Sequence, residues 1–201
     1  MSHHPLNRDV GIKTLCQGSA MDMITLRPVM ESDQTILLEI YMSTRWDELA
    51  PTGWNDRTKI EFLAMQFDIQ QRYYQNAFAD AQFYLVEIGD VAAGRFYLGY
   101  LPDEIRIIDI ALLPQFRGQG VGRCLLLHVQ KRAAEREVGV SIHVEQSNPA
   151  RALYERLGFL AQENKGFYTR MHWSPQVALP ALDAKLTAPD HRVVRWVNTA
   201  S

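Results

Sequence analysis

The sequence has few cysteines, with only Cys16 and Cys124 among its 201 residues. They lie far apart in the chain, so a structural disulfide is not expected, which fits a reducing compartment. No apolar run approaches the roughly 20 residues of a membrane-spanning helix, and the N-terminus lacks the apolar core of a signal peptide. His3 and His4 are too short a pair to indicate a metal site. These absences predict a cytoplasmic protein without a membrane span or a metal.

The chain also lacks an excess of charge of either sign. It has 21 Lys and Arg against 23 Asp and Glu, a formal net charge of −2. An overall basic field is what would favour nucleic acid or an anionic membrane, so neither partner is expected. Any anionic ligand must therefore be held by a local site.

Composition and periodicity divide the chain into three segments. Residues 1–22 are polar and without a period, which predicts a mobile tail. Residues 23–173 carry regular strand and helix patterns and are expected to form the compact domain. Residues 174–201 contain three prolines and form a C-terminal extension with a candidate strand over 193–197. The extension could supply a homodimer contact or remain a flexible end.

Two helices are predicted after a first strand over 24–28. Ser32 can cap the first helix, and the second spans about 56–78. The apolar residues expected on the buried faces are Ile36, Leu37 and Ile40 in the first helix and Ile60, Leu63 and Phe67 in the second.

The pattern then changes to a period of two. It predicts a meander of antiparallel strands over 83–88, 91–101 and 104–113. A glycine-rich turn follows, then a helix that ends at Gly139 and a strand over 140–145. Strand, helix and strand make one crossover unit, so the strands at its two ends are expected to be parallel.

A short helix and two further strands complete the expected domain. Asn148 caps the helix, and Gly158 lies just past its end. The strands cover 159–162 and 166–173. The fold class predicted is α/β of the α+β type, with a mixed, mostly antiparallel central sheet and helices on both faces.

The glycine-rich turn is the first candidate ligand site. Glycines at positions 118, 120 and 122 let the backbone approach a ligand, because no Cβ stands in the way. Successive N–H groups and the start of a helix favour a phosphate or pyrophosphate, and Arg117 can add a charge-assisted contact. The alternative on this motif alone is a plain turn without a ligand.

Two common nucleotide motifs do not fit this turn. A P-loop needs Lys and then Ser or Thr after its last glycine, whereas Arg123 and Cys124 follow here. The Rossmann pattern needs a third glycine where Arg123 or Leu125 stands. A dinucleotide-dependent oxidoreductase is therefore disfavoured.

A second motif lies further along, from Asn148 to Phe159, and reads NPARALYERLGF. With the turn, it resembles the two signatures of the GNAT superfamily of acetyl-CoA-dependent N-acetyltransferases. The first signature, (Arg/Gln)-x-x-Gly-x-(Gly/Ala), is matched by Arg117, Gly120 and Gly122. The second, an Asn followed by Leu-Tyr-x-x-x-Gly-Phe, is matched by Asn148 and the run that ends at Phe159.

The resemblance covers about residues 23–173. It implies that the protein transfers the acetyl group of its co-substrate acetyl-CoA to a primary amine. The amine is expected to attack directly, in a ternary complex. The resemblance also implies that the two parallel strands splay to admit the pantetheine arm, that the N–H of Leu112 polarises the thioester carbonyl, and that the turn holds the pyrophosphate. The coenzyme-binding residues it implies are Ile110, Ala111, Leu112, Arg117, Gly118, Gln119, Gly120, Val121, Gly122, Arg123, Asn148 and Tyr154.

Acetyl transfer needs a neutral amine, a stabilised oxyanion and a protonated leaving thiolate. Tyr154 is the candidate acid, with a core aromatic as the alternative. His143 is the candidate base, since an ordinary imidazole pKa near about 6.5 suits proton pickup at neutral pH; a structural histidine is the alternative. Glu145 could pair with His143 or act itself, unless it is simply solvated, and Glu104 could act through water.

The strand over 104–113 lacks the residues that would predict a catalytic base on it. Other members of the superfamily often carry Glu or His at the positions of Arg106 and Ile108, and this sequence has neither there. Asp109 is expected to point to the opposite face with Ile107 and Ala111, unless a β-bulge re-aims it. In the following helix, His128 and Cys124 are expected to be structural.

The acceptor is not specified by the sequence. Aromatic residues over 41–74 could hold an apolar or cationic acceptor, or fill the core. Asp47, Glu48, Asp56 and Glu61 could attract an amine, or form a solvated face. Peptide N-termini, lysine side chains, polyamines, antibiotics and small amines are all possible acceptors. A non-catalytic domain that binds acetyl-CoA as a sensor or structural ligand is the alternative function.

Overall fold

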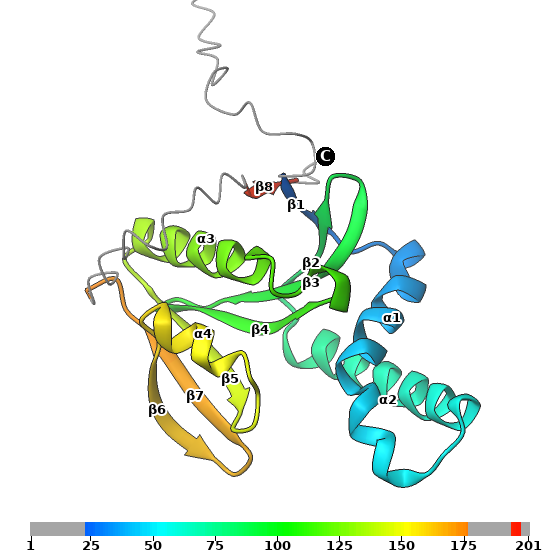
Figure 1. Cartoon of the computed structure of the whole chain (residues 1–201). Helices are drawn as coiled ribbons and strands as arrows, with labels where there is room; N and C mark the ends of the chain where they lie inside the picture. The colour runs from blue at the N-terminus through cyan, green and yellow to red at the C-terminus, as the bar shows by residue number, and fades with distance from the viewer. Residues whose placement is uncertain (1–22, 177–193, 198–201) are drawn as a thin grey trace, which may run out of the picture.

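The computed structural model describes residues 23–176 and 194–197. The predicted tail over 1–22, Cys16 and most of the C-terminal extension lie outside these residues. Within them, the chain forms a single sheet with helices on both faces (Figure 1).

Eight strands form the sheet in the order β6-β7-β5-β4-β3-β2-β1-β8. The pairs β4–β5 and β1–β8 are parallel and the other neighbours are antiparallel. This confirms the mixed, mostly antiparallel sheet and its parallel crossover. The strands are β1 (Ile24–Pro28), β2 (Gln82–Ile88), β3 (Val91–Tyr100), β4 (Glu104–Leu112), β5 (Gly139–Glu145), β6 (Leu160–Lys165), β7 (Tyr168–Trp173) and β8 (Val194–Trp196).

The helices cover the two faces of the sheet (Figure 1). On one face, α1 (Gln34–Arg45) and α2 (Asp56–Ala77) share a core that includes Leu37, Phe67 and Ala111. On the other, α3 (Val121–Glu135) and α4 (Arg151–Arg156) contribute to a larger core. Short 3-10 turns are η2 (Glu31–Asp33), η3 (Trp46–Thr52) and η4 (Pro114–Phe116). The sheet is thus a middle layer between two cores.

The C-terminal strand β8 pairs in parallel with β1 at the edge of the sheet. Its Trp196 packs edge-on against Tyr84 and lies 4.3 Å from the guanidinium carbon of Arg132. The indole N–H of Trp196 donates a hydrogen bond to His128. The strand expected near 193–197 is therefore confirmed, and His128 has a structural contact.

The start of α1 differs from the prediction. Ser32 lies inside η2, and the residue at the N-cap of α1 is Asp33. The carboxylate of Asp33 accepts hydrogen bonds from the Met30 N–H at 2.7 Å and from Arg27 at 2.7 and 2.8 Å. The cap prediction at Ser32 was therefore wrong: the cap position falls one residue later, and the Asp33 side chain bonds to Met30 and Arg27 and not to an N–H of α1.

The bonds to Asp33 predict a pH-dependent contribution to stability. Its hydrogen bonds from Arg27 hold the pKa of the Asp33 carboxyl below the ordinary value of 3.8. A lowered folded-state pKa contributes stability above the unfolded pKa, and that stability is lost as the pH falls through the folded value. We expect Asp33→Asn to lower the free energy of unfolding by about 2 kcal/mol at pH 7. In urea unfolding curves the difference from the parent should shrink below about pH 3.8; a difference unchanged at pH 3 would contradict this.

Two other details of the predicted elements were wrong. Ile60 of α2 is 44% exposed, although Leu63 and Phe67 are buried as expected. Gly139 begins β5, whereas α3 ends at Glu135. A Cβ at Gly139 would lie 2.3 Å from His172 Nε2, so this glycine serves the packing of β7. Within the described ranges, no helix has the length and apolarity to cross a membrane.

Candidate active site

A β-bulge in β4 lies where the two parallel strands part. Tyr97 of β3 pairs with Asp109 and Leu98 pairs with Ile107, which leaves Ile108 as the extra residue. The ladder between β4 and β5 runs to the pair Ile107 and Ile142 and ends there. A bulge disrupts pairing and bends its strand. The strands therefore diverge beyond this point, as the resemblance implied.

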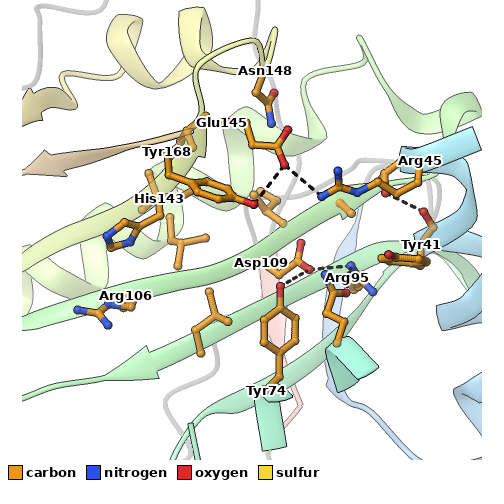
Figure 2. Close-up of a pocket in the computed structure, with 18 of the residues that line it drawn as sticks. Tyr41, Arg45, Tyr74, Arg95, Arg106, Asp109, His143, Glu145, Asn148 and Tyr168 are labelled. Carbon is orange, nitrogen blue, oxygen red and sulfur yellow. Dashed lines mark hydrogen bonds and ion pairs between the residues drawn. The ribbon is translucent and has the colours of Figure 1, made fainter. Parts of the chain in front are cut away.

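A cavity of about 690 Å³ lies at this divergence. Its walls come from β4, β5 and α4, and from the helices α1 and α2 on the other side (Figure 2). Of the residues predicted for the site, those that line it are Ile110, Ala111, His143, Glu145, Asn148 and Tyr154. The structure thus brings β4, β5 and α4, the elements that precede or carry the two sequence motifs, around one cavity.

Tyr154 forms part of the cavity wall and is otherwise buried, with 4% of its surface exposed. Its ring packs edge-on against Phe159 at 5.9 Å between centroids. Burial, and then the negative charge of Asp109, raise the pKa of the Tyr154 hydroxyl well above its ordinary value. The phenol therefore stays protonated at neutral pH and can donate a hydrogen bond into the cavity.

His143 and Glu145 line the cavity from β5. The side chain of Glu145 accepts hydrogen bonds from Arg45 at 3.2 Å and from the Tyr168 hydroxyl at 3.4 Å (Figure 2). Because Arg45 is the last residue of α1, this ion pair bridges α1 and β5. Glu145 is therefore tied across the cavity, and His143 is the exposed titratable group beside it.

Glu104 lies outside the cavity lining. Its carboxylate is bound by Arg106 at 2.9 Å and by Arg170 at 2.6 Å. Burial alone would raise the pKa of Glu104, but the hydrogen bond from Arg106 and the charges of Arg170 and Arg106 outweigh it and lower the pKa. These contacts argue against Glu104 as a base.

The sequence predicted Asp109 on one face with both Ile107 and Ala111, unless a β-bulge re-aimed it; the bulge is present, and Asp109 shares a side with Ala111 but not with Ile107. Ile107 packs in the core beneath α3, whereas Ala111 packs beneath α1 and α2, so the bulge reverses the alternation between them. Asp109 lines the cavity on the side of Ala111. Its carboxylate accepts hydrogen bonds from Arg95 at 2.7 Å and from the Tyr74 hydroxyl at 3.3 Å (Figure 2).

Arg95 is the buried cation of this group, with 2% of its surface exposed. The same Nη2 that binds Asp109 also donates to the Gln70 side chain at 3.0 Å. Its guanidinium carbon lies 5.7 Å from the Tyr41 ring and 5.5 Å from the Tyr97 ring. A buried charge needs a partner of opposite sign, so Arg95 and Asp109 depend on each other.

The glycine-rich turn has the backbone that only glycine adopts readily. Gly118 and Gly120 have φ of 71° and 83°, in the left-handed region. The helix α3 begins directly after them, at Val121, so its first N–H groups have no partner within the helix. A Cβ at Gly122 would lie 3.8 Å from the Leu153 side chain and 4.0 Å from Leu112, which places the turn against β4 and α4. The turn therefore fits an anionic group.

Arg117 is bonded within the protein. Its Nε donates to the Leu112 carbonyl at 2.7 Å, and its Nη2 donates to the carbonyl and hydroxyl of Ser43 at 3.1 and 3.0 Å. The sequence predicted that Arg117 contacts a phosphate, and such a contact would compete with its bonds to Leu112 and Ser43. Arg117 holds the turn against the ends of β4 and α1.

The wall of the cavity on the side of α1 and α2 carries aromatic residues of these helices and also Phe78, the C-cap residue of α2. Tyr41, Tyr73, Tyr74 and Phe78 line it, whereas Phe67 is in the core. Of the acidic residues considered for this wall, Glu48 lines the cavity and pairs with Arg45 at 3.0 Å. The aromatic segment thus serves both the core and the cavity.

Cys124 is buried in the core beneath α3, as expected. Among residues 23–176 and 194–197, no cluster of three or more His, Cys, Asp or Glu side chains could hold a metal ion.

Comparison with known proteins identifies relatives of this arrangement. The sequence profile of the Acetyltransferase (GNAT) family matches residues 44–159. A [Ribosomal protein bS18]-alanine N-acetyltransferase of Haemophilus influenzae is 40% identical over 58 residues, which are 28% of this chain and 40% of the relative. The chain thus spans less than half the length of this curated relative.

Solved structures share the fold at low sequence identity. The PaiA N-acetyltransferase of Thermoplasma acidophilum, in complex with coenzyme A, is similar with a TM-score of 0.58 and 15% identity over 75% of this chain and 98% of that one. The ribosomal-protein-S18-alanine N-acetyltransferase of Escherichia coli is similar with a TM-score of 0.50 and 21% identity over 75% of this chain and 91% of that one.

Proposed function

Because the chain belongs to the Acetyltransferase (GNAT) family, we propose that it transfers the acetyl group of acetyl-CoA to a primary amine by direct attack in a ternary complex. The observation that carries the proposal is the cavity between the diverging strands β4 and β5, with Tyr154 in its wall. The glycine-rich turn lies against the end of the same strand β4. One continuous region thus offers an anion site and a reaction site.

The coenzyme fits the residues that this region presents. The N–H groups from Gly118 to Arg123 would hold the diphosphate, where left-handed glycines and a helix start meet. Backbone groups of Ile110 and Leu112 would bind the pantetheine arm, with Asn148 on the other side. Beyond Ile107 the edge of β4 that faces β5 is unpaired, so its backbone groups are available for these contacts, except that the Leu112 carbonyl already accepts a hydrogen bond from Arg117.

Attack requires a neutral amine. At pH 7 only about 0.1% of an alkyl ammonium with a pKa near 10 is free base. His143 would take the ammonium proton, directly or through water, with Glu145 beside it on β5 and paired with Arg45 of α1. Asp109 would hold the acceptor nitrogen from the facing wall.

The nitrogen then forms a bond to the acetyl carbon, and the carbon–sulfur bond breaks. The N–H of Leu112 would stabilise the negative oxygen that develops. The attacking nitrogen is positively charged once it has bonded, and it loses a proton to solvent as the amide forms. The sulfur leaves with the electron pair of the broken bond and takes a proton from the Tyr154 hydroxyl, which regains one from solvent. The raised pKa of Tyr154 keeps that hydroxyl protonated until the sulfur leaves.

An amine panel read by release of free coenzyme A thiol tests the proposed function. The panel contains peptides with free N-termini, small amines, polyamines and aminoglycosides. We expect at least one amine to release thiol faster than the no-acceptor blank. Tight acetyl-CoA binding without release on any amine would overturn the proposal and support the sensor function instead.

A further inference from the structure

A second hollow of about 420 Å³ adjoins the active-site cavity. The residues that border both are Tyr41, Arg45, Glu48, Gln70 and Tyr73. From this shared border the second hollow continues along α2 past Ile69 and Gln66 to Phe62, with Leu49 of η3 on its other side. We call the two together the α2 trough. Its inner cavity is the active-site cavity, and its outer part, or outer trough, is the second hollow.

The outer part of the α2 trough offers groups suited to a polypeptide. Ile69 and Tyr73 are 56% and 60% exposed, so two large apolar side chains face solvent. Burying them under a ligand would be favourable. Gln70 lies between them on the helix and Gln66 lies one turn before it, and the amides of both can exchange hydrogen bonds with a peptide backbone. The outer part therefore offers both apolar contacts and hydrogen-bonding groups to an extended chain.

The length of the α2 trough exceeds what a small amine can use. From Tyr73 to Phe62 the helix makes about three turns, or roughly 16 Å. An extended chain rises about 3.3 Å per residue, so the trough accommodates about five residues. A small amine would occupy the inner cavity alone.

The charges around the inner cavity are balanced. Among the described residues that line it, three arginines face three carboxylates: Arg45, Arg95, Arg106, Glu48, Asp109 and Glu145. A polyamine would gain from an acidic surplus, which this lining does not offer. A chain with a single amine and a neutral backbone fits the balance better.

We propose, on the basis of the proposed acetyltransferase function, that the acceptor is the N-terminus of an extended polypeptide. Its α-amine lies in the inner cavity beside Asp109 and Tyr154. The next residues run along α2 from Tyr73 toward Phe62, with apolar side chains against Ile69. The α2 trough thus selects for acceptor length and not only for the amine.

A series of acceptors with the same first residue tests this proposal. The series runs from the amino-acid amide through di-, tri- and pentapeptides to a heptapeptide. We expect kcat/KM to rise about tenfold or more up to about five residues and then to level. Equal kcat/KM for the amide and the pentapeptide would overturn the peptide acceptor while leaving acetyl transfer intact. No turnover with any amine would instead contradict the proposed function.

A matched pair of variants locates the effect in the trough. Ile69→Glu places a charge in the outer trough, and Met65→Glu places one on the same helix at a residue that is 49% exposed and outside both linings. The readout is the ratio of kcat/KM for the pentapeptide to that for the amide. We expect this ratio to fall about tenfold in Ile69→Glu and to stay at the parent value in Met65→Glu. An unchanged ratio in Ile69→Glu, or an equal fall in both, would refute the assignment; thermal unfolding checks that both variants fold.

Discussion

Replacing Tyr154 by Phe is expected to lower kcat about 100-fold, the lower end of the range for a general acid. The lower end applies because a thiol with a pKa near about 8.5 is already a fair leaving group. Acetyl-CoA affinity should change little, since the ring and its packing against Phe159 remain. Steady-state kinetics give kcat, and isothermal titration gives the affinity of the variant for acetyl-CoA.

Tyr84→Phe is the matched control for the loss of a buried hydroxyl. Tyr84 is 5% exposed, close to the 4% of Tyr154, and it contacts Trp196 of β8 away from the cavity. We expect Tyr84→Phe to keep the parent kcat. An unchanged kcat in Tyr154→Phe would assign this tyrosine to the core alone, and equal losses in both variants would point to stability and not to chemistry.

Replacing Asp109 by Asn is expected to destabilise the protein by about 3 kcal/mol. The change leaves the guanidinium of Arg95, which is 2% exposed, without the carboxylate that it contacts at 2.7 Å. An uncompensated buried charge is costly, while removal of both charges often is not. Urea unfolding curves measure the loss. A variant that unfolds at the same urea concentration as the parent would show that the pair does not stabilise the fold.

A double variant separates the structural and the functional parts of Asp109. Asp109→Asn combined with Arg95→Met removes both charges, so we expect it to regain most of the lost stability. If Asp109 also holds the acceptor amine, the KM for the amine should stay raised about tenfold, the size of one lost charged hydrogen bond. A double variant with parent stability and parent KM would limit Asp109 to a structural role.

The predicted elements followed from patterns that are local in the chain. Period-two and helical spacing predicted β1 to β5, α2 and α3 close to their observed bounds. Two of the details that failed involve a partner that lies outside the predicted element itself. Asp33 is held by Arg27 of β1 and took the cap position expected for Ser32, and Gly139 is required by His172 of β7.

The sequence by itself determined the family and the two motifs, because a glycine turn and the run from Asn148 to Phe159 are each encoded in consecutive residues. It also predicted Tyr154, His143 and Glu145, which line the cavity. Only the tertiary structure decided the role of β4, where one extra residue at Ile108 turns Asp109 from the face of Ile107 to that of Ala111. A bulge is defined by the pairing of two strands, so neither strand's own pattern reveals it. The same holds for the α2 trough, which exists because η3 packs beside α2.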